Sequence, residues 1–178
     1  MKIASLAEIK KELQHLSDKE LIVLITELIK FSTDNKLFLF FQLYGKDHPQ
    51  LFAEMVQEEL THEFRNANTR NYHYAKKSAQ SIRRKLNKYL KFTKDKPTRI
   101  ELIVFFCEML SEYGYLTFCH PIIENLYNLQ VGKIEKLLNQ LHEDLQYDYQ
   151  NKVKELNSRK MKARLGKKGG VVATAHKW

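Results

Sequence analysis

Two stretches of this 178-residue chain are rich in lysine and arginine and nearly free of carboxylates. Residues 65–99 contain twelve basic side chains and one acidic side chain, and residues 157–178 contain seven basic side chains and no acidic one. The other two segments, 1–64 and 100–156, are both net negative. Lysine and arginine at this density, without counter-charges nearby in the sequence, are typical of surfaces that bind phosphates.

The basic residues of the first stretch gather on one side of a helix that we predict over residues 73–93. At 100° per residue, six of them fall within about 140°, and the apolar residues fall on a separate arc of about 100°. The basic arc comprises Lys76, Lys77, Arg83, Arg84, Lys88 and Lys91. The apolar arc comprises Ala75, Ala79, Ile82, Leu86, Tyr89 and Leu90.

Three sources of negative charge fit this basic arc. Like charges one helical turn apart repel by about 0.2 to 0.5 kcal/mol per pair, so counter-charges are needed. They come from a nucleic acid, from acidic neighbours within the fold, or from an acidic protein or membrane surface. The acidic neighbours considered are Glu54, Glu58 and Glu59, or Glu101, Glu108 and Glu112.

The second basic stretch predicts a flexible tail over residues 158–178. It contains no acid and too few apolar residues to form a core of its own. Fully extended, its 21 residues reach about 70 Å, and the ring of Trp178 offers a face for base stacking. Its other candidate phosphate contacts are Arg159, Lys160, Lys162, Arg164, Lys167 and Lys168. The alternative is a solvated end without a binding role.

Motifs for metal binding and catalysis are weak in this sequence. Glu12-x-x-His15 and Glu59-x-x-His62 match the spacing of di-iron helical bundles, but such a site needs two further glutamates on two further helices. "GKKGG" lacks the spacing, the following Ser or Thr, and the preceding strand of a phosphate-binding loop. We therefore expect a non-enzymatic protein with no cofactor and no metal.

The elements that position the basic residues are predicted to be helices throughout. Apolar residues recur every three or four positions, and no alternating strand pattern is present. Ser17 and Glu20 form a capping box before a helix over 18–31, and prolines begin further helices. Those prolines are Pro49, Pro97 and Pro121, and the remaining helices are expected over 6–16, 37–44 and 130–157.

These helices predict an all-α fold. We expect a compact array of seven or eight antiparallel helices over residues 1–157, followed by a basic unstructured C-terminal tail over 158–178. A short α-solenoid is the alternative.

The sequence also favours a cytoplasmic location without a membrane partner. The N-terminal stretch "MKIASLAEIKKEL" is charged where a secretory signal needs an unbroken apolar run. The most apolar stretches are about half of the roughly 20 residues that cross a bilayer. Cys107 and Cys119 are two thiols in no C-x-x-C pair, which suits reduced cysteines.

Three further stretches carry a family resemblance. "ELQHLSDKELIVLITELI", "SAQSIRRKLNKYLKF" and "IELIVFFCEMLSEYGYLTFCHPIIENLYNL" resemble an uncharacterised family of bacterial all-helical proteins, known as a domain of unknown function. The likeness covers about residues 12–156 and consists of apolar and aromatic positions with an "EYG" turn. It implies a cytoplasmic bacterial helical domain and supplies no catalytic residues, and the tail lies outside it.

The charge pattern favours a non-enzymatic RNA-binding or ribosome-associated protein, with RNA, including ribosomal RNA, as its partner. In this hypothesis the basic helix contacts phosphates and the tail runs along the RNA. RNA is preferred to DNA because no helix-turn-helix pairing is evident. The alternative is a helical interaction module that binds an acidic or amphipathic protein partner.

Overall fold

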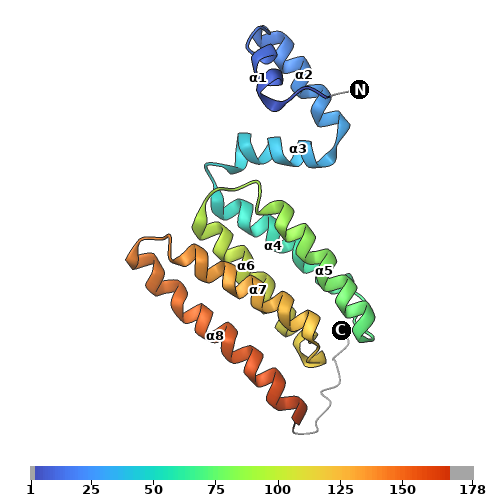
Figure 1. The fold of residues 1–178 in the computed structure, drawn as a ribbon, viewed down its shortest axis with the longest axis vertical. Coiled ribbons are helices and arrows are strands. Elements are labelled where there is room, and N and C mark those ends of the chain that lie inside the picture. Colours follow the sequence, from blue (N-terminus) through green and yellow to red (C-terminus); the bar gives the residue numbers. More distant parts are fainter. Residues whose placement is uncertain (1–2, 169–178) are drawn as a thin grey trace. The chain divides into compact units, whose positions relative to one another are not determined.

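The chain is helical across the residues that the structure, a computed structural model, describes. These are residues 3–168, and they form eight α-helices and no strand, which confirms the all-α prediction (Figure 1). Backbone contacts divide the chain into two units, Met1–Asp47 and His48–Trp178. This division differs from the single helical domain predicted over residues 1–157.

The first unit contains α1 (Leu6–Leu13), α2 (Asp18–Phe31) and α3 (Thr33–Phe40), followed by a π-helical turn over Phe41–Gly45. The capping box predicted at the start of α2 is present. The backbone N–H of Ser17 donates to Glu20 at 2.8 Å, and the backbone N–H of Glu20 donates to the Ser17 hydroxyl at 3.4 Å. These bonds satisfy two of the N–H groups that a helix start leaves unpaired.

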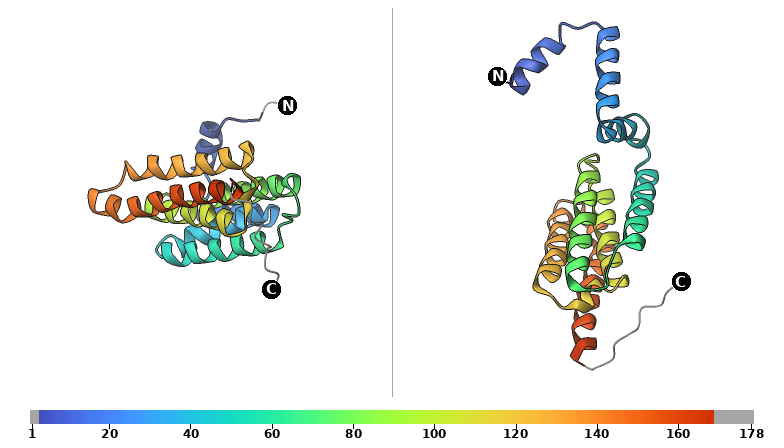
Figure 2. Two further views of the ribbon diagram at one scale, coloured as in Figure 1. Left: turned by 90° about the horizontal axis from the view of Figure 1, so that it is seen from below. Right: turned by 90° about the vertical axis from the view of Figure 1, so that its right-hand side faces the viewer.

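The second unit contains α4 (Pro49–Asn66), α5 (Tyr72–Tyr89), α6 (Lys96–Glu112), a 3₁₀ turn η2 (Tyr115–Phe118), α7 (Pro121–Leu138) and α8 (Glu143–Lys168). Figures 1 and 2 show successive helices of this unit running antiparallel, as predicted. Pro49, Pro97 and Pro121 each lie in a first turn, where a missing N–H costs nothing.

The core of the second unit is built around α6, which packs against α4, α5, α7 and α8. Apolar side chains are buried all around α6, as expected of a central helix. Phe64 of α4 contacts Phe106 of α6 and Tyr115 of η2, with ring centroids 5.7 Å apart in both pairs. The "EYG" turn ends α6 because Gly114 adopts a φ of 74°, where a side chain would be strained.

The helix predicted over residues 130–157 is wrong. The chain turns between Leu138 and Glu143, so that α7 includes residue 130 and α8 begins after the turn. Apolar residues continue through this turn at Leu141 and Leu145, so the apolar period gave no sign of the break. The turn lets α8 run antiparallel to α7 and pack against both α6 and α7 (Figure 1).

The predicted start of an unstructured tail at residue 158 also differs from the structure, because α8 continues to Lys168. Lysine, arginine, methionine, leucine and alanine, which dominate this segment, are all good helix formers. Arg159 adds an ion pair with Glu155 one turn earlier, at 2.9 Å. The rest of the predicted tail, 169–178 with Trp178, lies outside the described residues.

Candidate nucleic-acid interface

The predicted two-sided character of α5 is confirmed. Asn71 caps the helix by accepting a hydrogen bond from the backbone N–H of Tyr74 at 3.2 Å. Every residue of the predicted apolar arc is buried in the core: Ala75, Ala79, Ile82, Leu86, Tyr89 and Leu90. Because these side chains fix the rotation of α5 about its axis, the basic arc faces away from the core.

The α5 basic face consists of the six predicted residues, Lys76, Lys77, Arg83, Arg84, Lys88 and Lys91. Lys77, Arg84 and Lys91 are exposed, and the other three are half-buried. At 1.5 Å per residue, the face extends about 20 Å along the helix. Within the described part of the chain, no carboxylate forms an ion pair with five of them, namely Lys76, Lys77, Arg83, Arg84 and Lys91.

Internal neutralisation is present on the other side of α5. The Lys85 ammonium forms ion pairs with Glu59 and Glu63 of α4, the latter at 2.9 Å. Burial alone lowers the pKa of Lys85, but the hydrogen bonds and charges of the two glutamates outweigh it and raise the pKa. These two carboxylates therefore compensate Lys85 and not the basic face.

Arg159 of α8 is also compensated within the fold. Its guanidinium lies 2.9 Å from Glu155, 3.5 Å from Glu112 and 3.8 Å from Glu108. Burial raises the pKa of Glu108, and the charge of Arg159 opposes that rise. Arg159 therefore holds α8 against Glu108 and Glu112 of α6, two of the glutamates that were considered from the sequence as partners of the basic arc instead.

The other basic residues of α8 are placed differently. Lys160 donates to the side-chain oxygen of Asn128 on α7 at 2.6 Å, and Lys162 is exposed. The side chains of Arg164, Lys167 and Lys168 lie outside those that the structure describes. Among the predicted C-terminal contacts whose side chains are described, Lys160 and Lys162 are therefore the two that remain compatible with binding a phosphate.

The start of α5 and the last turns of α8 lie at the same end of the second unit. The ring of Tyr72 stacks on His120 with centroids 3.5 Å apart, and the Cys119 thiol lies 4.0 Å from the Ala163 carbonyl oxygen. Because Cys119 and His120 are adjacent, these contacts connect both helices to one turn. Lys76 also lies over the Tyr72 ring, 5.6 Å from its centroid.

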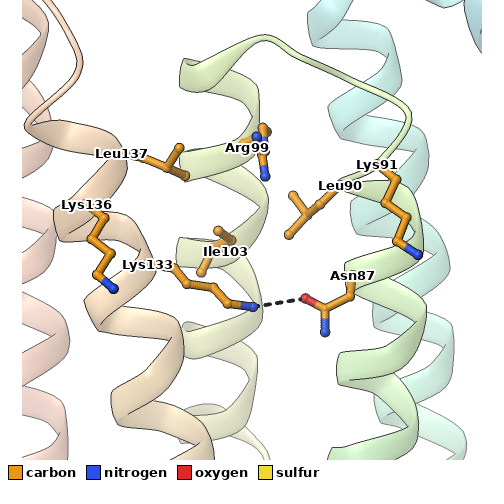
Figure 3. A pocket seen from close by; sticks show the side chains of 8 residues that line it. All are labelled: Asn87, Leu90, Lys91, Arg99, Ile103, Lys133, Lys136 and Leu137. Carbon is orange, nitrogen blue, oxygen red and sulfur yellow. Dashed lines mark hydrogen bonds between the residues drawn. The ribbon is translucent and has the colours of Figure 1, made fainter.

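A cavity of about 440 Å³ lies among α5, α6 and α7 and was not predicted from the sequence. Four cations line it: Lys91 just after α5, Arg99 on α6, and Lys133 and Lys136 on α7. Figure 3 shows Lys133 reaching across the front of α6 to Asn87 on α5, where its ammonium donates to the amide oxygen at 3.1 Å. Leu90, Ile103 and Leu137 supply the apolar part of the lining.

The cavity carries positive charge without local compensation. Among the described residues, no carboxylate forms an ion pair with any of the four cations. Burial and the nearby charges of Arg83 and Arg99 lower the pKa of Lys133. The Nε atoms of Arg99 and of Arg83, which lies outside the cavity lining, are buried and have no hydrogen-bond partner among the described residues.

Sequence reasoning placed Lys91 in the basic arc but missed Arg99, Lys133 and Lys136, because the four come together only in three dimensions. Lys133 and Lys136 belong to segment 100–156, whose total charge is negative, and Arg99 belongs to the helix after the basic one. A signal was available: Lys133 and Lys136 are the only lysines or arginines between Arg99 and Lys152, and they lie three residues apart. On a helix, that spacing places them on one side.

The residues considered for metal or catalytic roles have other surroundings. Glu59 pairs with Lys85, and the ring of His62 contacts the Asn66 amide at 3.0 Å. Over residues 3–168, no group of three or more His, Cys, Asp or Glu side chains is arranged to hold a metal ion. Burial raises the pKa of Cys107, so its thiol stays protonated at neutral pH and is a poor nucleophile.

Comparisons with known proteins identify no relative of this chain. No protein-family model, curated protein or solved structure matches it, and the resemblance to a bacterial family of unknown function stays a prediction. Among the helices of the described region, none combines the length and apolar character that crossing a bilayer requires.

Proposed function

We propose that this protein is a non-enzymatic RNA-binding protein that contacts the phosphate backbone through the α5 basic face. The observation that carries this proposal is the lack of ion pairing on that face. Over the described residues, five of its six cations have no carboxylate partner, although the same fold pairs Lys85 and Arg159 with glutamates. The positive charge of this face is therefore available to bind an external polyanion.

We propose Lys160 and Lys162 of α8 as additional phosphate contacts. The contacts at Cys119 and His120 bring the last turns of α8 to the end of the unit where α5 begins. A backbone that follows α5 towards Lys76 therefore comes near α8. Irregular RNA suits such a surface better than a straight duplex, and the successive helices of the second unit run antiparallel, unlike the crossed pair of a helix-turn-helix (Figure 1). Association with the ribosome in the bacterial cytoplasm is the setting that we propose.

Paired variants of the full-length protein test this proposal. Lys77 and Arg84 are both exposed and form no ion pair with the described residues, so replacing them tests the face with little risk to the fold. In fluorescence anisotropy with a labelled single-stranded RNA, Lys77→Gln with Arg84→Gln should weaken binding about tenfold at 0.1 M salt. The matched control is Lys10→Gln with Lys11→Gln, which makes the same charge change on exposed residues of α1.

The control separates a local contact from a general charge effect. We expect the α1 pair to change RNA affinity by less than about twofold. Equal losses in the two pairs, or no measurable RNA binding by the wild-type protein, would rule out the α5 basic face as the site. Binding of an acidic protein by a chain that does not retain RNA would favour the interaction-module alternative.

A further inference from the structure

The cavity among α5, α6 and α7 differs in shape from the α5 basic face. A convex helix face touches a polymer at separate points, whereas this cavity is lined by cations from α6, from α7 and from the segment just after α5. Its volume of about 440 Å³ falls within the range of small-molecule sites. The geometry therefore suits a compact ligand with several negative charges.

Donor groups at the cavity match the oxygens of phosphate. Arginine presents its N–H groups in a planar fork that fits phosphate, and lysine adds point charges. Arg99 lines the cavity, and Arg83 lies close enough for its charge to act on Lys133. The lining therefore offers a phosphate ligand the guanidinium of Arg99 and the ammonium groups of three lysines.

We propose that this cavity binds a compact polyphosphate group, a chain of two or three linked phosphates carried either by a free nucleotide or by the 5′ end of an RNA. A terminal phosphate carries about 1.5 to 2 negative charges at neutral pH, so such a chain offsets most of the four positive charges that line the cavity. Leu90, Ile103 and Leu137 then contact the organic group beside the phosphates. This site goes beyond backbone binding and does not depend on it.

Calorimetric titration of the full-length protein tests the cavity with three probes: sodium tripolyphosphate, ATP and AMP. We expect saturable one-to-one binding of tripolyphosphate and ATP. AMP should bind at least about tenfold more weakly, because each lost charge-assisted contact costs about that much. Lys133→Gln with Lys136→Gln should weaken tripolyphosphate binding by about tenfold or more. Both lysines are exposed, and thermal unfolding of the unliganded variant checks that it is folded.

The control pair is Lys77→Gln with Arg84→Gln, which removes the same charge from α5 outside the cavity. It should leave tripolyphosphate affinity within about threefold while it weakens RNA. Absence of saturable binding, AMP binding as tight as ATP, or equal losses in both pairs would overturn the cavity proposal. RNA affinity is measured separately from tripolyphosphate affinity, so failure of the backbone-binding proposal is distinguishable from failure of the cavity proposal.

Two RNAs of one sequence identify the source of the phosphates. Tighter binding of the 5′-triphosphate form than the 5′-hydroxyl form, lost in the Lys133 and Lys136 variant, would support the cavity and assign it to RNA ends. Equal binding of the two RNAs together with ATP binding that depends on the same lysines would support the cavity and assign it to a free nucleotide. If the Lys133 and Lys136 variant keeps both the preference for the 5′-triphosphate RNA and the binding of ATP, the proposal is contradicted.

Discussion

Individual lysines of α5 have different environments in the structure, although all of them lie in the same basic stretch of the sequence. Lys85 lies between Glu59 and Glu63 of α4, whereas Lys77 is exposed and forms no ion pair within the described part of the chain. The difference follows from the direction in which each side chain leaves a helix whose rotation is fixed by its buried apolar arc. Helical periodicity was sufficient to place Lys85 apart from the basic face, but it did not identify the glutamates that Lys85 contacts.

Replacing Lys85 tests this difference through stability. Lys85→Ala leaves Glu59 and Glu63 close together without their shared cation, so the free energy of unfolding should fall by about 1 kcal/mol, a value limited by solvent screening. Lys77→Ala should change it by less than about 0.5 kcal/mol. Urea denaturation measures both, and equal effects would show that the ion pairs contribute nothing specific.

The pH dependence of the Lys85 effect follows from its pKa. The folded-state pKa of Lys85 is raised above 10.5, so its stabilisation is fully present below that pH and lost as the pH rises through the folded value. The difference between the wild-type protein and Lys85→Ala should therefore be constant around neutral pH and shrink in strongly alkaline solution.

At the scale of helices, the starts were predicted better than the ends. Ser17 and the three prolines carry local signals that do not depend on the rest of the fold. The turn after Leu138 carries no such signal, because apolar residues continue through it. Whether residues 158–168 are helical depends on contacts of α8 with α6 and α7, which composition alone does not show.

Truncations test the extent of α8. Ending the chain after Asn157 removes the Arg159 ion pairs with Glu108 and Glu112 and the Lys160 bond to Asn128. The free energy of unfolding should fall by about 1 to 2 kcal/mol, because these contacts hold α8 to α6 and α7.

Ending the chain after Lys168 keeps all of α8 and is the matched control. That truncation retains the Arg159 and Lys160 contacts, so it should be more stable in thermal unfolding than the truncation after Asn157. Equal stability of the two truncations would contradict a structured α8 beyond residue 157.

At the scale of the whole molecule, the net charge belongs to one of the two units. Residues 1–47 contain seven basic and seven acidic side chains, whereas residues 48–178 contain 23 basic and 14 acidic ones. The entire net charge of +9 is therefore carried by the unit that includes α5 and α8. The net charges of the sequence segments predicted where much of this charge lies. They did not indicate Lys133 and Lys136 of α7, because these lysines belong to a segment with a net negative charge.

The whole-molecule distribution predicts how RNA affinity responds to salt. Each phosphate that the protein neutralises releases condensed counterions, and this release depends on salt concentration. The α1 lysines belong to the neutral unit, so their replacement should leave the salt dependence unchanged.

The most direct test is the slope of log affinity against log salt for the full-length protein and single-stranded RNA. With about five phosphates neutralised, the slope should be about −3.5, or about −4.5 for a duplex. Lys77→Gln with Arg84→Gln should reduce its magnitude by about 1.4 on single-stranded RNA. A flat salt dependence, or an unchanged slope in that variant, would contradict phosphate binding through the α5 basic face.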